Sequence, residues 1–329
     1  MDGCNNATDI ANSFATRFQQ ACQLNNADYN QKLKVRFEEK FRSYQPGSKL
    51  QWISVETVEK CIGDMKLQKA AGVDSIEAEH LAEHLCHAHT RICVILALLF
   101  NAMLMHGVVP SMFGVGIIIP LIKGHNMDGS SSDNYRGTTL SVRISKVLEM
   151  CILDIYGNYF VTSDLQFGFK KGVGCNHALY AVHSVMRHFT NGNSTVNLCA
   201  LDMSKAIDRS IAFALFMKCM NHNVPIALLN ISVNWYGMCT VDVQWDNAFS
   251  DVICLQCGVR QGCVLSPVLF TVYVNDVIMA LSASGYVCYF HGMFVGCFMY
   301  ADDLLLLYPS LCDLQLISAV LNWKEFICV

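Results

Sequence analysis

The chain has 329 residues, 53% of them apolar, and carries a formal net charge of −4 at pH 7. This length and apolar content allow a large hydrophobic core, as two domains or as one domain with subdomains. The acidic balance argues mildly against a nucleic-acid-binding protein, although local basic patches can exist within it. The 17 cysteines are scattered through apolar runs of a chain too long for a disulfide scaffold, so we expect reduced thiols.

No targeting or membrane segment is expected. The first six residues have neither the basic nor the apolar stretch of a signal peptide. The apolar run at residues 92–105 is interrupted by Asn101 and followed by Gly107 and Pro110, so it is shorter than the roughly 20 residues that a bilayer requires. We expect a buried helix there, and an intracellular protein of the nucleus or cytoplasm that has no membrane partner.

In chain order, residues 1–50 predict an N-terminal helical segment. Its first 30 residues are polar and only weakly periodic, which predicts a helix of modest order, and residues 31–42 suggest an exposed helix. Ser54 is a helix cap, and apolar residues at helical spacing continue this helix to Met65.

A second helix, over residues 78–86, carries His80 and His84 four positions apart on one face. A zinc site is conceivable here. Ordinary surface histidines are the favoured interpretation, because no Cys-x-x-Cys pair accompanies them.

Basic residues flank two loops in the next part of the chain. Lys123 and Arg136 flank a Gly-, Ser- and Asp-rich loop after a strand at residues 114–121, where they suit a grip on a triphosphate or are simply surface bases. Residues 166–174 combine glycines and phenylalanines with Lys170 and Lys171, a pattern that suits phosphate contact and base stacking.

The remaining elements alternate short strands with helices. We expect strands at 197–202, 240–245 (an edge or hairpin strand), 251–257, 286–290 and 293–300, and helices ending near 221, 236 and 281, with a last helix beginning at Asp313. Ser266 is expected to cap the helix that ends near 281. Cys254 and Cys257 have zinc-knuckle spacing, but no partner pair follows and a strand would point them to opposite sides.

Two adjacent acids, Asp302 and Asp303, stand between apolar runs that read as the two strands of a hairpin. Buried carboxylates need a partner, and Mg²⁺ prefers carboxylate oxygens; the alternative is a solvated Asp-Asp turn. Asp202 ends another apolar strand, and a glycine-punctuated loop at residues 258–267 lies between. Carboxylates from two strands beside such a loop are what phosphoryl transfer with two metal ions requires.

The chain resembles the reverse transcriptases of LINE-type (non-LTR) retrotransposons. The segments that carry the resemblance are LDMSKAID (201–208), GVRQGCVLSPVLFTVYVND (258–276) and MYADDLLLL (299–307), joined by KAAGVDSI (69–76), the run from Asn134 to Glu149, and QFGFKKGVG (166–174). The resemblance implies an α+β fold, the right-hand polymerase fingers and palm, with an antiparallel palm sheet packed against helices. Fingers would cover residues 51–195, palm 196–310 and a truncated C-terminal helix 311–329, with the thumb missing or truncated.

The resemblance also implies roles for individual residues. Asp202 and Asp302 would hold two Mg²⁺ or Mn²⁺ ions, with Asp303 in support and the carbonyl of Met203 as a further ligand. Lys123 and Arg136 would hold the β- and γ-phosphates, and Gln261 and Gly262 would contact the nucleotide and the template. Ile207 would contact the sugar, at a position where the family usually has Phe. Tyr300 would contact the primer backbone or simply pack in the hairpin.

The function implied is an RNA-directed DNA polymerase that extends a DNA primer on an RNA template with deoxynucleoside triphosphates. The rest of the parent polyprotein, including its endonuclease, would be absent from this chain. The alternative is a catalytically inactive retrotransposon remnant that binds nucleic acid or protein. Lys205 and Asp208 complete the start of a helix, where a structural role for Asp208 is at least as favoured as a chemical one. For Asp276, helix capping or a salt bridge within the palm is the favoured interpretation.

Overall fold

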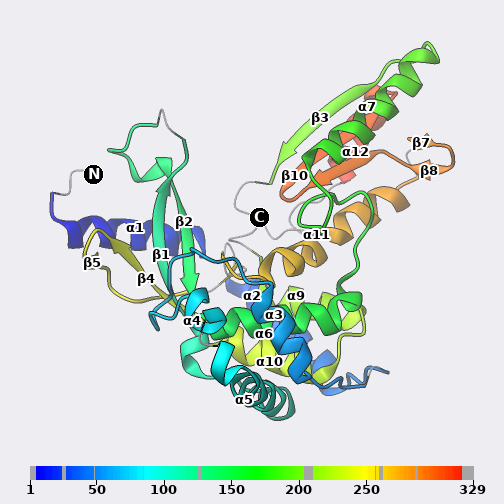
Figure 1. Ribbon diagram of the computed structural model, residues 1–329. Helices are drawn as coiled ribbons and strands as arrows, with labels where there is room; N and C mark the ends of the chain where they lie inside the picture. Colours follow the sequence, from blue (N-terminus) through cyan, green and yellow to red (C-terminus); the bar gives the residue numbers. More distant parts are fainter. Residues whose placement is uncertain are drawn as a thin grey trace.

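Two β-sheets stand apart in the fold, and a helical core joins them (Figure 1). The computed structural model describes residues 5–23, 27–47, 49–83, 85–124, 127–203, 210–255, 257–258, 262–285 and 288–320. Helices and sheets are mixed along the chain, as the α+β prediction requires.

The first sheet has five strands in the order β2-β1-β4-β5, with β6 also paired to β4. Its strands are β1 (Val115–Ile122), β2 (Tyr135–Ser141), β4 (Thr240–Trp245), β5 (Ala248–Phe249) and β6 (Ile253–Cys254). β1 and β2 form an antiparallel hairpin, whereas β1 and β4 run parallel. β4 therefore has partners on both sides and is not an edge strand, whereas the hairpin alternative is confirmed: β4 pairs antiparallel with β5 directly after it, through Gln244↔Phe249 and Trp245↔Ala248. Its predicted pairing with residues 251–257 is confirmed at β6.

The parallel pair also crosses the predicted fingers–palm boundary. β1 belongs to residues 51–195 and β4 to residues 196–310, yet they are neighbours in one sheet from Val115↔Thr240 onward. A division at residue 195 therefore does not separate the two sheets along the chain.

Helix α1 (Ala7–Ala21) covers one face of the five-stranded sheet, which the weak periodicity of its sequence did not predict. Asn6 caps it by accepting the Thr8 N–H at 3.0 Å. Phe14 is fully buried, and its ring lies 5.1 Å from Tyr135 and 5.2 Å from Trp245. A narrow apolar stripe thus anchors a helix that is otherwise polar.

The second sheet has three antiparallel strands in the order β3-β10-β9. They are β3 (Asn197–Asp202), β9 (Cys297–Tyr300) and β10 (Asp303–Tyr308). Leu304, Leu306 and Tyr308 of β10 are buried, while Leu198 of β3 is 46% exposed on the other face. Helices α7 (Cys175–Asn191), α11 (Ser266–Ala283) and α12 (Leu311–Val320) lie beside this sheet, and a small hairpin, β7 (Tyr289–Phe290) with β8 (Met293–Phe294), precedes β9 (Figure 1).

The other helices form the layer at the base of the molecule in Figure 1. They are α2 (Ala27–Arg42), α3 (Val55–Gly63), α4 (Ala78–Glu83), α5 (Leu85–His106), α6 (Arg143–Tyr156), α9 (Ala212–Asn221) and α10 (Ile226–Tyr236). Of the short 3-10 turns, η1 (Ser111–Gly114) precedes β1, η2 (Ser132–Asn134) lies in the β1–β2 hairpin, and η3 (Gly157–Phe160) follows α6. Ser54 caps α3 by accepting the Thr57 N–H at 3.2 Å, as predicted. α3 ends at Gly63, two residues before the predicted Met65.

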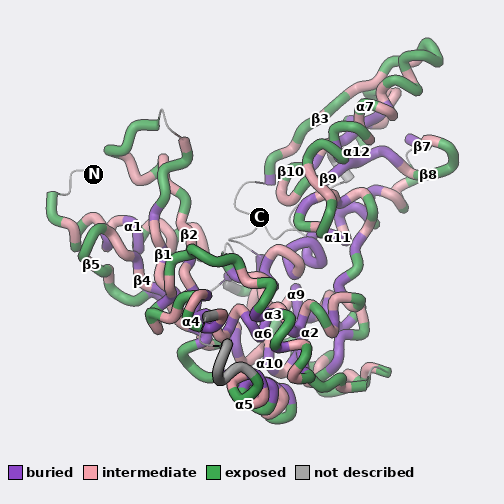
Figure 2. The backbone as a smooth tube through the Cα atoms, viewed as in Figure 1, coloured by how far each residue is buried: buried purple, intermediate pink, exposed green. Residues whose placement is uncertain are grey.

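Two apolar helices differ from their predictions. α5 buries one face, with Phe100 and Leu104, but leaves Ile95 62% and Leu98 66% exposed, so the prediction of a buried helix there holds for one face only. In the part of the chain that the structure describes, α11 alone is long and apolar enough to cross a membrane. Of its 18 residues, 61% are buried inside the fold, and Figure 2 shows the helix largely in the colour of buried residues.

Candidate active site

Asp202 and Asp303 face each other at one end of the three-stranded sheet. They are directly paired in the β3–β10 ladder, and Tyr300 is paired with Asp303 on the other side in β9. Side chains of directly opposed residues lie on the same face, with Cβ atoms about 4.5–5.5 Å apart. The two acids, separated by a hundred positions in the sequence, are therefore neighbours, as the sequence predicted.

Asp302 lies in the turn between β9 and β10, beside this pair. Its side chain is half-buried, and burial is the largest cause of the raised pKa of its carboxyl group. The negative charges of Asp303 and Asp202 raise this pKa further, while the positive charge of Arg136 opposes them. The three acids and one base of the other sheet thus act on one another electrostatically.

The chain after β3 is held against the same turn. The backbone N–H of Met203 donates to the carbonyl of Asp302 at 3.2 Å, and the Met203 side chain is buried. This contact places Met203, whose carbonyl is the predicted further metal ligand, beside the turn that carries Asp302.

The described residues of the glycine-punctuated loop contact β2 and the segment just before α9. Gly262 has a φ of +84°, and a Cβ added to it would lie 2.3 Å from the carbonyl oxygen of Thr139 in β2. Gly258 donates its N–H to the carbonyl of Ser210, after β3, at 2.7 Å. A residue with a side chain cannot take the place of Gly262 without moving β2.

Glu149 of α6 is a site residue that the sequence did not single out. It is 2% exposed, and its Oε2 accepts the backbone N–H groups of Val264 and of Leu265, the latter at 3.0 Å. These N–H groups lie directly before α11, so the carboxylate stabilises the positive end of the helix dipole. Ser266 is the first residue of α11 and makes no capping bond from its side chain, so its predicted capping role is wrong; a distant carboxylate satisfies the helix start instead.

The two predicted phosphate-binding bases belong to the β1–β2 hairpin. Lys123 is exposed and donates from Nζ to the carbonyl of Asp133 at 2.7 Å. Arg136 is exposed on β2. The next residue, Gly137, faces α1, because a Cβ added to it would lie 3.2 Å from the ring of Phe18. Because neighbouring strand residues alternate, Arg136 points away from α1, on the face from which its charge reaches Asp302.

The two lysines of the QFGFKKG segment differ. Lys170 donates from Nζ to the carbonyl of Ser163 at 2.6 Å and lies 3.8 Å from the carboxylate of Asp164, and burial lowers its pKa. Lys171 is exposed. Lys170 thus bonds its own loop, whereas the side chain of Lys171 is open to solvent.

Several predicted residues have other positions or fall outside the described residues. Asp276 forms an ion pair with Lys218 at 3.1 Å, the salt bridge that its structural interpretation favours. Cys254 is exposed, while the buried Cys257 donates its thiol to the carbonyl of Cys22. The residues whose predicted roles lie outside the described part of the chain are His84, Lys205, Ile207, Asp208 and Gln261.

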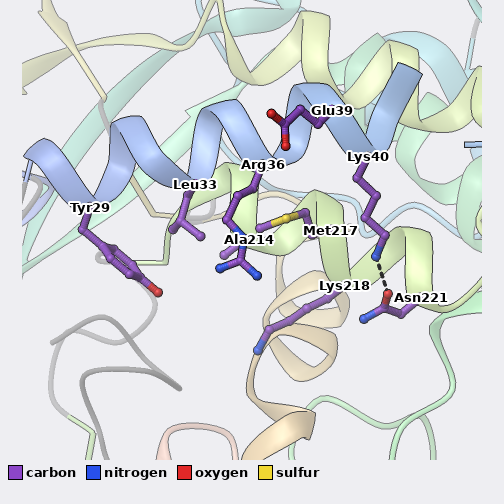
Figure 3. A pocket seen from close by; sticks show the side chains of 9 residues that line it. All are labelled: Tyr29, Leu33, Arg36, Glu39, Lys40, Ala214, Met217, Lys218 and Asn221. Atoms are coloured by element: carbon purple, nitrogen blue, oxygen red, sulfur yellow. Dashed lines mark hydrogen bonds between the residues drawn. The ribbon is translucent and has the colours of Figure 1, made fainter. Parts of the chain in front are cut away.

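A groove of about 460 Å³ lies between α2 and α9 (Figure 3). It is lined by Tyr29, Leu33, Arg36, Glu39, Lys40, Ala214, Met217, Lys218 and Asn221. Lys40 bonds Asn221 at 2.6 Å and Lys218 pairs with Asp276, so two of its bases have partners within the protein. Of the predicted catalytic and substrate-binding residues that the structure describes, none lines it.

The acidic cluster suits a divalent cation by its chemistry. Its donors are hard carboxylate oxygens, and both causes that raise the pKa of Asp302, burial first and then the charges of Asp303 and Asp202, are ones that a bound cation would offset. Within the described residues, no three His, Cys, Asp or Glu side chains already enclose a common point.

Comparison with known proteins agrees with this geometry. A family model described as reverse transcriptase (RNA-dependent DNA polymerase) matches residues 123–325. The RNA-directed DNA polymerase from mobile element jockey of Drosophila funebris is 26% identical over 281 residues, 83% of this chain and 29% of the relative. The probable RNA-directed DNA polymerase from transposon BS of Drosophila melanogaster is 26% identical over 283 residues, 79% of this chain and 28% of the relative.

A third relative, the probable RNA-directed DNA polymerase from transposon X-element of Drosophila melanogaster, is 26% identical over 186 residues, 55% of this chain and 20% of the relative. The chain spans less than a third of the length of these curated relatives. The family match includes Arg136, the three acids and the glycine loop. The chain belongs to the reverse transcriptase (RNA-dependent DNA polymerase) family.

Proposed function

We propose that this chain is the polymerase core of a LINE-type, non-LTR retrotransposon reverse transcriptase, which extends a DNA primer on an RNA template. The observation that carries the proposal is the direct pairing of Asp202 with Asp303, with Asp302 in the adjoining turn. In this assignment the three-stranded sheet is the palm and the five-stranded sheet belongs to the fingers.

Asp202 and Asp302 would each supply carboxylate oxygens to two Mg²⁺ or Mn²⁺ ions, and the carbonyl of Met203 would supply a further oxygen. When bound, such ions lower the pKa of the primer 3′-hydroxyl and neutralise charge on the leaving pyrophosphate. Asp303 would support the site from the paired position in β10.

The β1–β2 hairpin would hold the incoming deoxynucleoside triphosphate. Arg136 already acts on Asp302 across the space between the sheets, so a phosphate bound near the acids would lie within range of its charge. Lys123 would bind the phosphates next to it. Gly262 permits close backbone approach, and Gln261 and Ile207 would contact the nucleotide base and sugar.

Nucleic acid would lie along the exposed side of the acid-bearing sheet end. Tyr300 is 36% exposed and shares the face of Asp303, where it would contact the primer backbone. Lys171 would contact phosphate, and Lys170 would support its loop from within. The exposed bases give the template–primer a local positive surface within an acidic total charge.

Primer extension on poly(rA)·oligo(dT) with Mg²⁺ or Mn²⁺ tests the proposal, comparing the wild-type chain with Asp302→Ala. The exposed acid Asp64 provides the matched control, Asp64→Ala. We expect incorporation by the wild type and the control and none by Asp302→Ala. Incorporation that survives Asp302→Ala would contradict the metal-site assignment. No incorporation by the wild type, with duplex binding retained, would favour the inactive remnant.

A further inference from the structure

The turn that presents Asp302 has an unfavourable backbone conformation. Ala301, the first residue of the two-residue turn between Tyr300 and Asp303, has a φ of +56°. This left-handed region is costly for a residue with a Cβ, and such a conformation persists only where surrounding structure holds it. The position of Asp302 therefore depends on what holds Ala301.

Gln166 holds both backbone polar groups of Ala301. Its Oε1 accepts the Ala301 N–H at 3.1 Å, and its Nε2 donates to the Ala301 carbonyl at 3.2 Å. The same Oε1 also accepts the N–H of Gly168 at 2.8 Å. Gln166 is only 1% exposed, so water cannot replace the three bonds if the amide is lost.

The segment around Gln166 is itself fixed against the hairpin. Phe167 donates its N–H to the carbonyl of Met299 at 2.8 Å, and Met299 donates its N–H to Leu165 at 2.8 Å, so this segment adds to the edge of β9. A Cβ on Gly168 would lie 2.2 Å from the Ala301 nitrogen. The backbone therefore approaches the turn as closely as it can.

The start of this loop is anchored to α11. The side chain of Asn275 accepts the Ser163 N–H at 2.8 Å, and Lys170 donates to the Ser163 carbonyl at 2.6 Å. The support thus runs from α11 through residues 163–166 to the turn.

We propose that Gln166 is a positioning residue for the acid site: its amide holds Ala301 in the left-handed conformation and thereby sets where Asp302 stands. This inference rests on the proposed polymerase function for its catalytic consequence. A displacement of about 1 Å at a reacting centre lowers turnover on the order of 100-fold, so an uncharged residue that touches no substrate would control the rate.

The decisive variant is Gln166→Met, which keeps the length of the side chain and removes all three bonds. Asn101 provides a matched control, because its amide accepts the Ile53 N–H and donates to the Ile53 carbonyl, both at 2.8 Å, far from the acids. Asn101→Leu likewise removes an amide that bonds both the N–H and the carbonyl of one residue. The double variant Gln166→Met/Ala301→Gly removes the cost of the positive φ as well.

Three measurements on the full chain separate positioning from simple loss of stability. The rate of amide hydrogen exchange across residues 298–304 reports the stability of the turn directly and does not require an active enzyme. Mn²⁺ affinity, measured without primer or nucleotide, reads the placement of the acids, and the turnover number in primer extension reads the consequence.

In Gln166→Met we expect exchange across residues 298–304 to rise about tenfold, Mn²⁺ affinity to fall about tenfold, and turnover to fall on the order of 10- to 100-fold at unchanged primer–template affinity. Asn101→Leu should lower the melting temperature and change none of these three. The double variant should regain part of the lost turnover, since glycine adopts a positive φ without the clamp.

Exchange and Mn²⁺ affinity in Gln166→Met that match Asn101→Leu would overturn the inference. A wild-type chain that binds no Mn²⁺ and incorporates no nucleotide would instead contradict the proposed function, and the exchange across residues 298–304 would still decide whether Gln166 holds the turn.

Discussion

The two sheets hold their functional side chains in different ways. At the acid end of the three-stranded sheet, a strand ladder, a buried amide and a glycine in close contact fix the turn that carries Asp302. On the five-stranded sheet, Lys123 and Arg136 stand on an exposed hairpin supported by contacts of its own loop and by an ion pair between Arg17 and the exposed Asp133 at 3.3 Å.

This difference follows from what each region has to bind. Metal-ion chemistry needs oxygen atoms placed within fractions of an ångström, whereas attraction between a base and a phosphate falls off slowly with distance. We therefore expect substitutions at the acid end to abolish activity, and substitutions on the β1–β2 hairpin to produce graded effects.

Asp302→Asn should cause the largest effect, a loss of turnover on the order of 10³-fold or more, because it removes a carboxylate from the proposed metal site. The same variant should fold slightly more stably at pH 7. The pKa of Asp302 is higher in the folded chain than in the unfolded chain, so its contribution to stability is favourable below the unfolded pKa and is lost as the pH rises through the folded pKa.

Urea unfolding at two pH values checks the second part. The gain should be at most about 0.5 kcal/mol at pH 7, because the side chain is only half-buried and solvent screens it. It should vanish at a pH low enough to protonate the carboxyl group in both states. A gain that persists at low pH would show that charge is not its cause.

Gly262→Ala should destabilise the chain by about 2–4 kcal/mol, since the new Cβ meets the carbonyl of Thr139 in a backbone conformation that favours glycine. Gly63→Ala is the control: nothing lies within 4 Å of its added Cβ, and its free energy of unfolding should change little. Equal unfolding midpoints for the two variants would show that the loop does not press against β2.

Arg136→Gln should raise the KM for the deoxynucleoside triphosphate about tenfold and leave duplex binding intact. Because the charge of Arg136 lowers the pKa of Asp302, its removal raises that pKa further. The acid limb of the kcat/KM profile should therefore move to higher pH than in the control Arg42→Gln. If the acid limb of the kcat/KM profile lies at the same pH in Arg136→Gln as in Arg42→Gln, the charge of Arg136 does not act on Asp302.

The smallest effects should come from the two lysines of the QFGFKKG segment. Lys171→Met should reduce the slope of log affinity against log salt by about one phosphate contact. Lys170→Met should leave that slope unchanged and lower stability by about 1 kcal/mol, because its bonds go to carbonyls of its own loop. Reversed results for the pair would restore Lys170 as the nucleic-acid contact.

Local sequence patterns predicted the elements well and their long-range partners poorly. The apolar run at residues 197–202 became β3 with those same bounds, and the acid pair lies at a hairpin tip, with Asp302 in the turn and Asp303 as the first residue of β10. The packing of α1 was missed because its stripe of Phe14 and few other residues is diluted by polar neighbours.

The supports of the site were missed for a related physical reason. Gln166 bonds Ala301, and Glu149 bonds the start of α11, across separations of more than a hundred residues. The quoted motifs contain both residues, but the partner of a buried amide or carboxylate depends on tertiary contacts that no local pattern encodes.

The central claim is that three distant acids form one divalent-cation site, and a Mn²⁺ titration of the full chain followed by electron paramagnetic resonance tests it most directly. The account predicts that the wild type binds Mn²⁺ and that Asp202→Asn and Asp302→Asn each weaken binding at least about tenfold, whereas Asp64→Asn does not. Wild-type affinity in either Asp202→Asn or Asp302→Asn would contradict the claim.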